Sequence, residues 1–109
     1  MAELTYVVAL EKSPKGSDIL RVKFGAESHN GPKVRDAKAQ IDALIDEGAF
    51  DSVGVLFVNG PASLPVAMTL AHGVSHVVEV VACFDPKPNH YVVSVAHGSE
   101  YAVGDVIEV

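Results

Sequence analysis

The sequence contains a single cysteine, Cys83, among 109 residues. One thiol cannot close a disulfide within the chain, so the protein is not one of the small secreted scaffolds that disulfides hold together. Cys83 lies within an apolar run, which disfavours a role as a nucleophile. We therefore expect a reducing compartment and no thiol chemistry.

Basic residues are also few. Eight lysines and arginines stand against fourteen aspartates and glutamates, a formal net charge of −6. Extended electrostatic binding to the phosphate backbone of duplex DNA needs an excess of positive charge, so we expect no duplex DNA partner. A short anionic ligand in a local pocket is compatible with this balance.

Long apolar stretches are missing as well. No run reaches the roughly 20 residues that a transmembrane helix needs. The N-terminus carries the acidic Glu3 in place of the basic and then apolar segments of a secretory signal. We expect a cytoplasmic protein with no membrane partner.

The hydrophobic content, 49% of the residues, is sufficient to bury one core in a chain of this length. We therefore expect a single domain over residues 1–109. A chain this short offers few side chains for a complete site, which favours sites built across a subunit boundary.

Apolar patterning predicts six strands and two helices. The strands are expected at Thr5–Glu11, Ile19–Phe24, Val53–Val58, Val80–Phe84, Tyr91–Ala96 and Val103–Val109, and the helices at residues 34–48 and 64–78. Turn residues 13–18 join the first two strands as a hairpin, residues 85–90 form a loop, and residues 98–102 form a connector. Val53–Val58 is continuously apolar, as a strand buried on both faces would be.

The resulting order, ββαβαβββ, has a helix between successive strands at two places. This pattern predicts the α/β class, an α+β sandwich in which a mixed sheet carries two helices, close to a ferredoxin-like fold.

Two histidines, His72 and His76, stand four residues apart on the second helix. This spacing puts both imidazoles on the same side of the helix, one turn apart, where they can hold a metal or a phosphate. The alternative is that they are half-solvated residues at the edge of the core.

The second helix is apolar on two sides. One arc contains Leu64, Ala67, Met68, Ala71, Val74 and Val78, and we interpret it as the core face. A second stripe contains Val66, Leu70, Gly73 and Val77, and it indicates either a subunit interface or a surface that the first helix or a loop covers.

Asp85 and Lys87 follow an apolar strand directly, with Pro86 between them. The carboxyl ends of strands in α/β folds usually carry ligand-handling side chains, so Asp85 is a candidate metal ligand or base and Lys87 a candidate phosphate contact. An ordinary turn aspartate is the alternative. His97 ends the next strand, and antiparallel pairing would place it far from Asp85 in one chain, so we expect the site to be shared between subunits.

The turn from Gly60 to Ser63 joins a strand to the second helix. Free backbone N–H groups at such a turn can hold a phosphate. The alternative is a tight turn with Ser63 as the helix cap. His29 and His90 lie in loops and are expected to be exposed.

Several motifs taken together resemble the Csx-three family of small CRISPR-associated proteins. They are Asn59-Gly-Pro-Ala-Ser-Leu-Pro-Val-Ala, the two-histidine helix, Cys83-Phe-Asp-Pro-Lys87, Tyr91-Val-Val-Ser-Val-Ala-His97 and Tyr101-Ala-Val-Gly-Asp-Val-Ile107. The resemblance covers residues 59 to 107. It implies a small ferredoxin-like domain that forms dimers and higher stacks, binds cyclic tetra-adenylate between subunits and cuts it with manganese(II) or another divalent cation.

By this resemblance His76, Asp85 and His97 are the catalytic residues, and Asp85 is the first choice for metal binding, with His76 as a further ligand or a proton-transfer group. Lys87 stands where an arginine is frequent in the family. A lysine keeps the positive charge but cannot form the two parallel hydrogen bonds that an arginine forms with a phosphate. His72, Gly60 and Ser63 are candidate ligand contacts.

The function implied is a ring nuclease that destroys the cyclic oligoadenylate messenger of type III CRISPR systems and so ends the antiviral signal. The alternatives are a sensor that binds cyclic oligoadenylate or short RNA without cutting it, a 3′ exonuclease that removes adenylates from RNA, and a structural oligomeric module.

Overall fold

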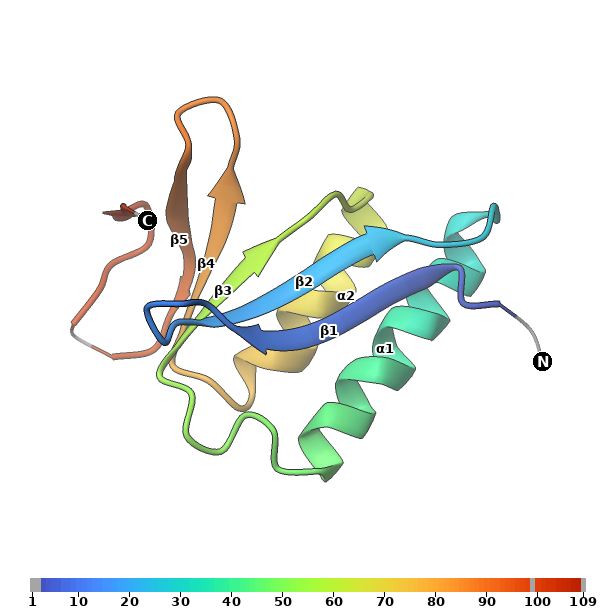
Figure 1. Cartoon of the computed structure of the whole chain (residues 1–109), viewed down its shortest axis with the longest axis horizontal. Coiled ribbons are helices and arrows are strands. Elements are labelled where there is room, and N and C mark those ends of the chain that lie inside the picture. Colours follow the sequence, from blue (N-terminus) through green and yellow to red (C-terminus); the bar gives the residue numbers. More distant parts are fainter. Residues whose placement is uncertain (1–2, 99, 109) are drawn as a thin grey trace.

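The computed structural model describes residues 3–98 and 100–108, and its elements follow the expected order ββαβαβββ (Figure 1). The strands are β1 (Tyr6–Lys12), β2 (Asp18–Phe24), β3 (Val55–Asn59), β4 (Val80–Asp85), β5 (His90–Ala96) and β6 (Val106–Ile107), and the helices are α1 (Asn30–Asp46) and α2 (Leu64–Ser75). Residues 1–2, Ser99 and Val109 lie outside the described residues, although the expected domain, connector and last strand include them.

The six strands form one sheet in which each strand lies beside its neighbours in the sequence. β2, β3 and β4 are parallel, whereas β1 pairs antiparallel with β2, β5 with β4, and β6 with β5. Both helices lie on the same face of the sheet (Figure 1). The parallel strands give the sheet two distinct ends: an amino edge, where β2, β3 and β4 begin, and a carboxyl edge, where they end.

The predicted α/β class, the mixed sheet, the two helices and the order of elements are confirmed. One detail of the expected ferredoxin-like arrangement differs. A ferredoxin-like split βαβ unit has another strand between the two strands that a helix connects, whereas α1 and α2 each connect adjacent parallel strands here. The order of elements along a sequence does not determine which strands become neighbours.

The main core lies between the sheet and the two helices. Tyr6, Leu20 and Leu56 from three strands are 0% exposed and meet the helix residues Ile41 and Val66. Each such aliphatic or aromatic side chain stabilises the fold by roughly 1.5–3 kcal/mol when fully buried. This core fixes the positions of both helices on the sheet.

A smaller apolar cluster lies on the opposite face of the sheet. It contains the buried residues Val80, Ala82, Tyr91 and Val93, with Val55, Phe57, Phe84, Ala96, Tyr101 and Ile107 packed against it. Because this cover is partial, Leu56 is the only fully buried residue of β3, and Val55 and Phe57 stay half-buried. The prediction that β3 is buried on both faces was therefore wrong.

Several predicted boundaries were also wrong. α1 begins at Asn30, four residues before the expected start, and ends at Asp46, two residues before the expected end. α2 ends at Ser75 with His76 as its C-cap, three residues before the expected end, because the N–H groups of Val77 and Val78 both return to the carbonyl of Val74 in a closing turn. The last strand is reduced to Val106–Ile107, since residues 102–105 form a turn in which the backbone N–H of Ala102 donates to the carboxylate of Asp105. In the described part of the chain, no helix combines the length and apolarity needed to cross a membrane.

Side chains of α1 cover the free edge of β1. Gln40 accepts the N–H of Val8 at 2.9 Å and donates to the carbonyl of Tyr6 at 2.8 Å. The carboxylate of Asp36 accepts both the backbone N–H and the hydroxyl of Thr5, and these two bonds lower the pKa of Asp36. Satisfying this edge removes a template for pairing with another chain.

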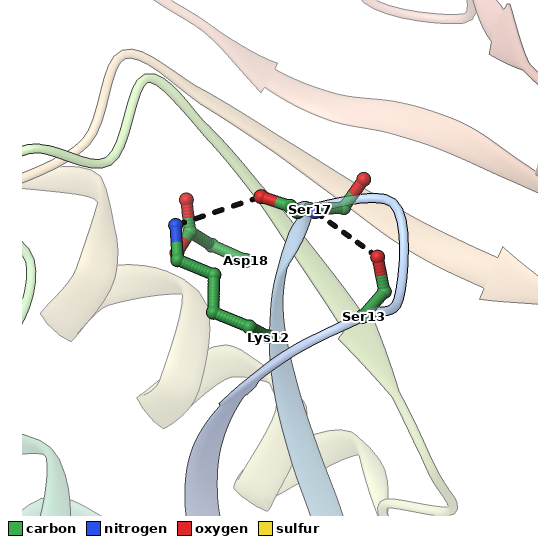
Figure 2. Close-up of polar contacts among 5 residues, drawn as sticks. Lys12, Ser13, Ser17 and Asp18 are labelled. Carbon is green, nitrogen blue, oxygen red and sulfur yellow. Dashed lines mark hydrogen bonds and ion pairs between the residues drawn. The ribbon is translucent and has the colours of Figure 1, made fainter.

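The predicted hairpin turn at residues 13–18 is confirmed, and Figure 2 shows its polar contacts. Lys12 forms an ion pair with Asp18 at 2.8 Å, and the Ser13 hydroxyl accepts the N–H of Ser17 at 3.0 Å. The N–H of Gly16 donates to the Ser13 carbonyl at 2.9 Å. These bonds hold the tip of the hairpin at the amino edge of the sheet.

Tyr6 gives the fold a predicted dependence on alkaline pH. Burial raises the pKa of Tyr6 from 10.0 to about 12, so its contribution to stability is complete below pH 10 and is lost as the pH rises to about 12. We expect the wild type to lose up to about 3 kcal/mol of unfolding free energy over this range. Urea unfolding at a series of pH values measures this loss.

The matched variant is Tyr6→Phe. It lacks the hydroxyl that donates to the carbonyl of Pro61 at 2.7 Å, so it should be less stable at neutral pH by about 1 kcal/mol. Its stability should then fall less between pH 10 and 12 than that of the wild type. Equal losses in the two proteins would contradict the assignment to Tyr6.

Candidate functional site

The predicted site residues lie at two opposite ends of the sheet. Asp85 is the last residue of β4 at the carboxyl edge, whereas the N–H of His97 donates to the carbonyl of Glu79, the residue before β4, at the amino edge. Six residue steps along the chain separate Asp85 from Glu79, which is roughly 20 Å in an extended strand. The antiparallel pairing of β4 with β5 thus keeps Asp85 and His97 apart in one chain, as expected.

At the amino edge, His76 and His97 lie on one open depression of about 560 Å³. Two exposed carboxylates, Asp51 and Glu79, line the same depression. Neither carboxylate was among the site residues predicted from the sequence. Their positions in the sequence could have indicated them, because Glu79 directly precedes β4 and Asp51 lies in the loop that leads to β3.

His72 and His76 do share one side of α2, as their spacing predicted. Their Nε2 atoms are 3.2 Å apart and their ring centroids 4.8 Å apart, and both side chains are exposed. Both residues also line a cavity of about 290 Å³ between α1 and α2.

The apolar sides of α2 are assigned differently from the sequence-based interpretation. Val66 and Leu70 are buried, and Gly73 packs closely against Ile41 of α1. The second apolar stripe is therefore covered by α1, which was one of its two predicted roles, and does not form a subunit interface. In the arc interpreted as the core face, Val74 and Val78 are buried as expected, whereas Leu64 and Met68 are 75% and 66% exposed. The helix is apolar almost all round, so periodicity alone could not identify its packed side.

At the carboxyl edge, Asp85 and Lys87 are exposed at the start of the β4–β5 hairpin. Asp85 pairs with His90 in the strand ladder, and Asn89 closes the turn at φ 58°. His90 is thus partly buried by the hairpin instead of exposed as expected, whereas His29 is exposed.

The turn at Gly60 and Ser63 lies at the same carboxyl edge. Gly60 has φ +138°, and a Cβ there would stand 1.8 Å from the carbonyl oxygen of Val22. Ser63 occupies the N-cap position of α2, but its hydroxyl donates to Asn30 Oδ1 at 2.8 Å and forms no cap bond. The first turn of α2 also carries no acidic residue, so its amino end stays electropositive.

Candidate metal ligands form no cluster of three or more in the described part of one chain. Among residues 3–98 and 100–108, no group of three or more His, Cys, Asp or Glu side chains is placed to hold a metal ion. The two predicted metal ligands, Asp85 and His76, belong to opposite edges of the sheet. A site that uses both must therefore take them from different chains.

The open face of the sheet carries an aromatic cluster that the sequence analysis missed. Phe57 and Phe84 pack on Tyr91 with ring centroids 4.8 Å and 5.2 Å away, and Asn59 donates to the Tyr91 hydroxyl at 3.0 Å. A hollow of about 410 Å³ lies between this cluster and the hairpin tip, where Lys15 is among its lining residues. The three aromatic residues come from three strands, so no single sequence motif marks the cluster.

Comparison with protein families now identifies the class of protein. Residues 41–108 match the model of a family described as CRISPR-associated protein (Cas_csx3). Because the match spans more than half of the chain, the protein belongs to this family, as its motifs indicated. The match includes α2 and both histidines at the amino edge, as well as Asp85 and Lys87. No curated protein and no solved structure matches the chain.

Proposed function

We propose that this CRISPR-associated protein is a metal-dependent ring nuclease that cleaves a cyclic oligoadenylate, with cyclic tetra-adenylate as the first candidate, in the cytoplasm. The cleavage would switch off type III CRISPR antiviral signalling. The observation that carries the proposal is the division of the family-matching residues between two edges: His76 and His97 at one, Asp85 and Lys87 at the other. A ring that lies between two chains can contact both sets.

The site arises when the carboxyl edge of one copy faces the amino edge of another. The exposed apolar residues Leu64 and Met68 support such self-association, because exposed apolar groups of this size favour a protein contact over water. A homodimer or a higher stacked homo-oligomer is the assembly that we propose.

Each residue has a chemical task in this arrangement. Lys87 neutralises a nonbridging phosphate oxygen, and the backbone N–H groups after Gly60 and the hydroxyl of Ser63 contact a neighbouring phosphate or ribose. His97 and His76 hold and transfer the protons of the attacking and leaving oxygens, while His72 contacts the ligand beside His76.

A divalent cation fits the donor set that the two edges would bring together. Asp85 offers a carboxylate and His76 an imidazole, and manganese(II) accepts both oxygen and nitrogen ligands. When bound, the ion would act as a Lewis acid on the phosphodiester. These are the two residues that we propose as its protein ligands.

The test is incubation of the purified protein with radiolabelled cyclic tetra-adenylate, with manganese(II) or with a chelator. We expect linear products only with the metal. A ring that is retained intact would instead support a sensor. Shortening of a linear RNA with a 3′ adenylate tail, with the ring left uncut, would support the exonuclease. If the protein neither binds nor cleaves the ring or the RNA, the nuclease, sensor and exonuclease proposals are all excluded.

A further inference from the structure

The imidazoles of His72 and His76 are held at a separation that fits a single metal ion. Their Nε2 atoms are 3.2 Å apart, within hydrogen-bond distance of each other, and a bound ion would replace this contact. Two nitrogens that each bind zinc at about 2.0–2.1 Å lie about 3.3 Å apart at a tetrahedral angle and about 2.9 Å apart at a right angle. The observed separation falls between these two values.

The backbone fixes the two helix positions from which the imidazoles extend. The buried residues Val66, Leu70 and Val74 anchor α2 on the sheet, and Gly73 packs against Ile41 of α1. The helix ends at the two histidines, His72 lying in its last turn and His76 at its C-cap. The aligned peptide dipoles of a helix leave partial negative charge at its carboxyl end, so a cation is stabilised there.

We propose that His72 and His76 form a chelating site for a late first-row divalent cation, with Zn²⁺, Ni²⁺ and Co²⁺ as the class of ligand. Imidazole nitrogen suits these ions better than it suits manganese, and the general order of affinity places Mn²⁺ lowest. The site is thus chemically different from the carboxylate-containing site proposed for catalysis.

Both histidines are exposed, so an ion can reach the pair from solvent. Water fills the remaining coordination positions, because no third His, Cys, Asp or Glu in the described residues completes a ligand group. Asp42 lines the same cavity between the helices and adds negative charge, although Lys38 pairs with it at 2.6 Å.

The chelate also has a regulatory consequence, which rests on the proposed function. An ion held by both imidazoles occupies His76 Nε2, so this atom can no longer bind the catalytic cation or transfer a proton. Zinc or nickel should therefore inhibit ring cleavage even when manganese is in excess. Loss of His72 should reduce this inhibition, measured as the ratio of the activities of the same variant with and without zinc.

The binding test uses the untagged chain and no nucleotide. Calorimetric titration with NiCl₂ or ZnCl₂ should give one ion per chain, and His72→Gln and His76→Gln should each weaken binding at least about tenfold. His29→Gln is the matched control, because it removes an exposed histidine from a different part of the fold and should leave the affinity unchanged. Circular dichroism confirms that each variant is folded.

A second readout follows the imidazoles directly. Substoichiometric Ni²⁺ should broaden the ring proton resonances of two of the five histidines, and those two should be the ones absent in His72→Gln and His76→Gln. If His72→Gln binds Ni²⁺ or Zn²⁺ with the affinity of the wild type, the proposed chelating site is wrong. Because neither readout involves cleavage, a failure of the ring nuclease proposal leaves this result unchanged, and the reverse also holds.

Discussion

Gly60→Ala is expected to bring the protein to the limit of its stability. The new methyl group would stand 1.8 Å from the backbone carbonyl oxygen of Val22, in the adjacent strand, and a backbone atom cannot rotate away. The φ of +138° adds strain for any residue with a Cβ. Together these effects should lower the unfolding free energy by about 3–5 kcal/mol, a large part of the about 5–15 kcal/mol of a typical domain.

Alanine substitutions at two other glycines separate the effect of the steric clash from the effect of backbone strain. Gly16 also has a positive φ, +87°, but no atom lies within 4 Å of a Cβ built there, so Gly16→Ala should cost only about 1–2 kcal/mol. Gly54 has open space and no positive φ, so Gly54→Ala should change stability by less than about 1 kcal/mol. Urea unfolding followed by circular dichroism compares the three variants, and equal losses at Gly60 and Gly16 would contradict the steric argument.

Asp85→Ala and His97→Ala are each expected to reduce cyclic tetra-adenylate cleavage by about 10²–10⁴-fold, as loss of a positioned acid, base or ligand does. Coexpression of the two variants should restore about a quarter of the wild-type rate. One interface in four then joins an intact carboxyl edge from the His97→Ala chain to an intact amino edge from the Asp85→Ala chain.

The control for this experiment is coexpression of Asp85→Ala with the double variant Asp85→Ala/His97→Ala. Every carboxyl edge in that mixture lacks the carboxylate, so no activity should return. If Asp85→Ala with His97→Ala also stays inactive while the wild type cuts the ring, each site belongs to a single chain and the shared site is wrong. Full activity of both single variants would remove these residues from the mechanism.

The fold could be predicted from the sequence as far as local patterns specify it. Alternation in Leu20, Val22 and their exposed neighbours marked the hairpin, and helical spacing marked α1, because each of these elements has one apolar side. α2 is apolar on two sides, so the spacing could not tell which side α1 would cover. The pairing of the parallel strands β2, β3 and β4 depends on the whole chain and was not contained in any local pattern.

The sequence was sufficient to predict the candidate site residues and the separation of Asp85 from His97. The direction of β4 and β5 was sufficient to place Asp85 and His97 at opposite ends, and the structure has them there. Asp51 was missed because it approaches His76 only through the folding of a separate loop. Glu79 follows His76 by three residues, and its place beside His97 depends on the pairing of β4 with β5. The 3.2 Å separation between His72 and His76 also required side-chain positions, since the i, i+4 spacing defines a side of the helix and no distance.

The sequential order of the strands has a consequence for how the protein is made. Each strand from β2 to β6 pairs with the strand synthesised just before it, so the sheet can extend in the order in which the chain leaves the ribosome. No late strand has to insert between two that already pair, and the separations between paired strands along the chain stay short, which favours rapid folding. A nascent chain that ends after β4 would already hold both helices and the strands that they cover.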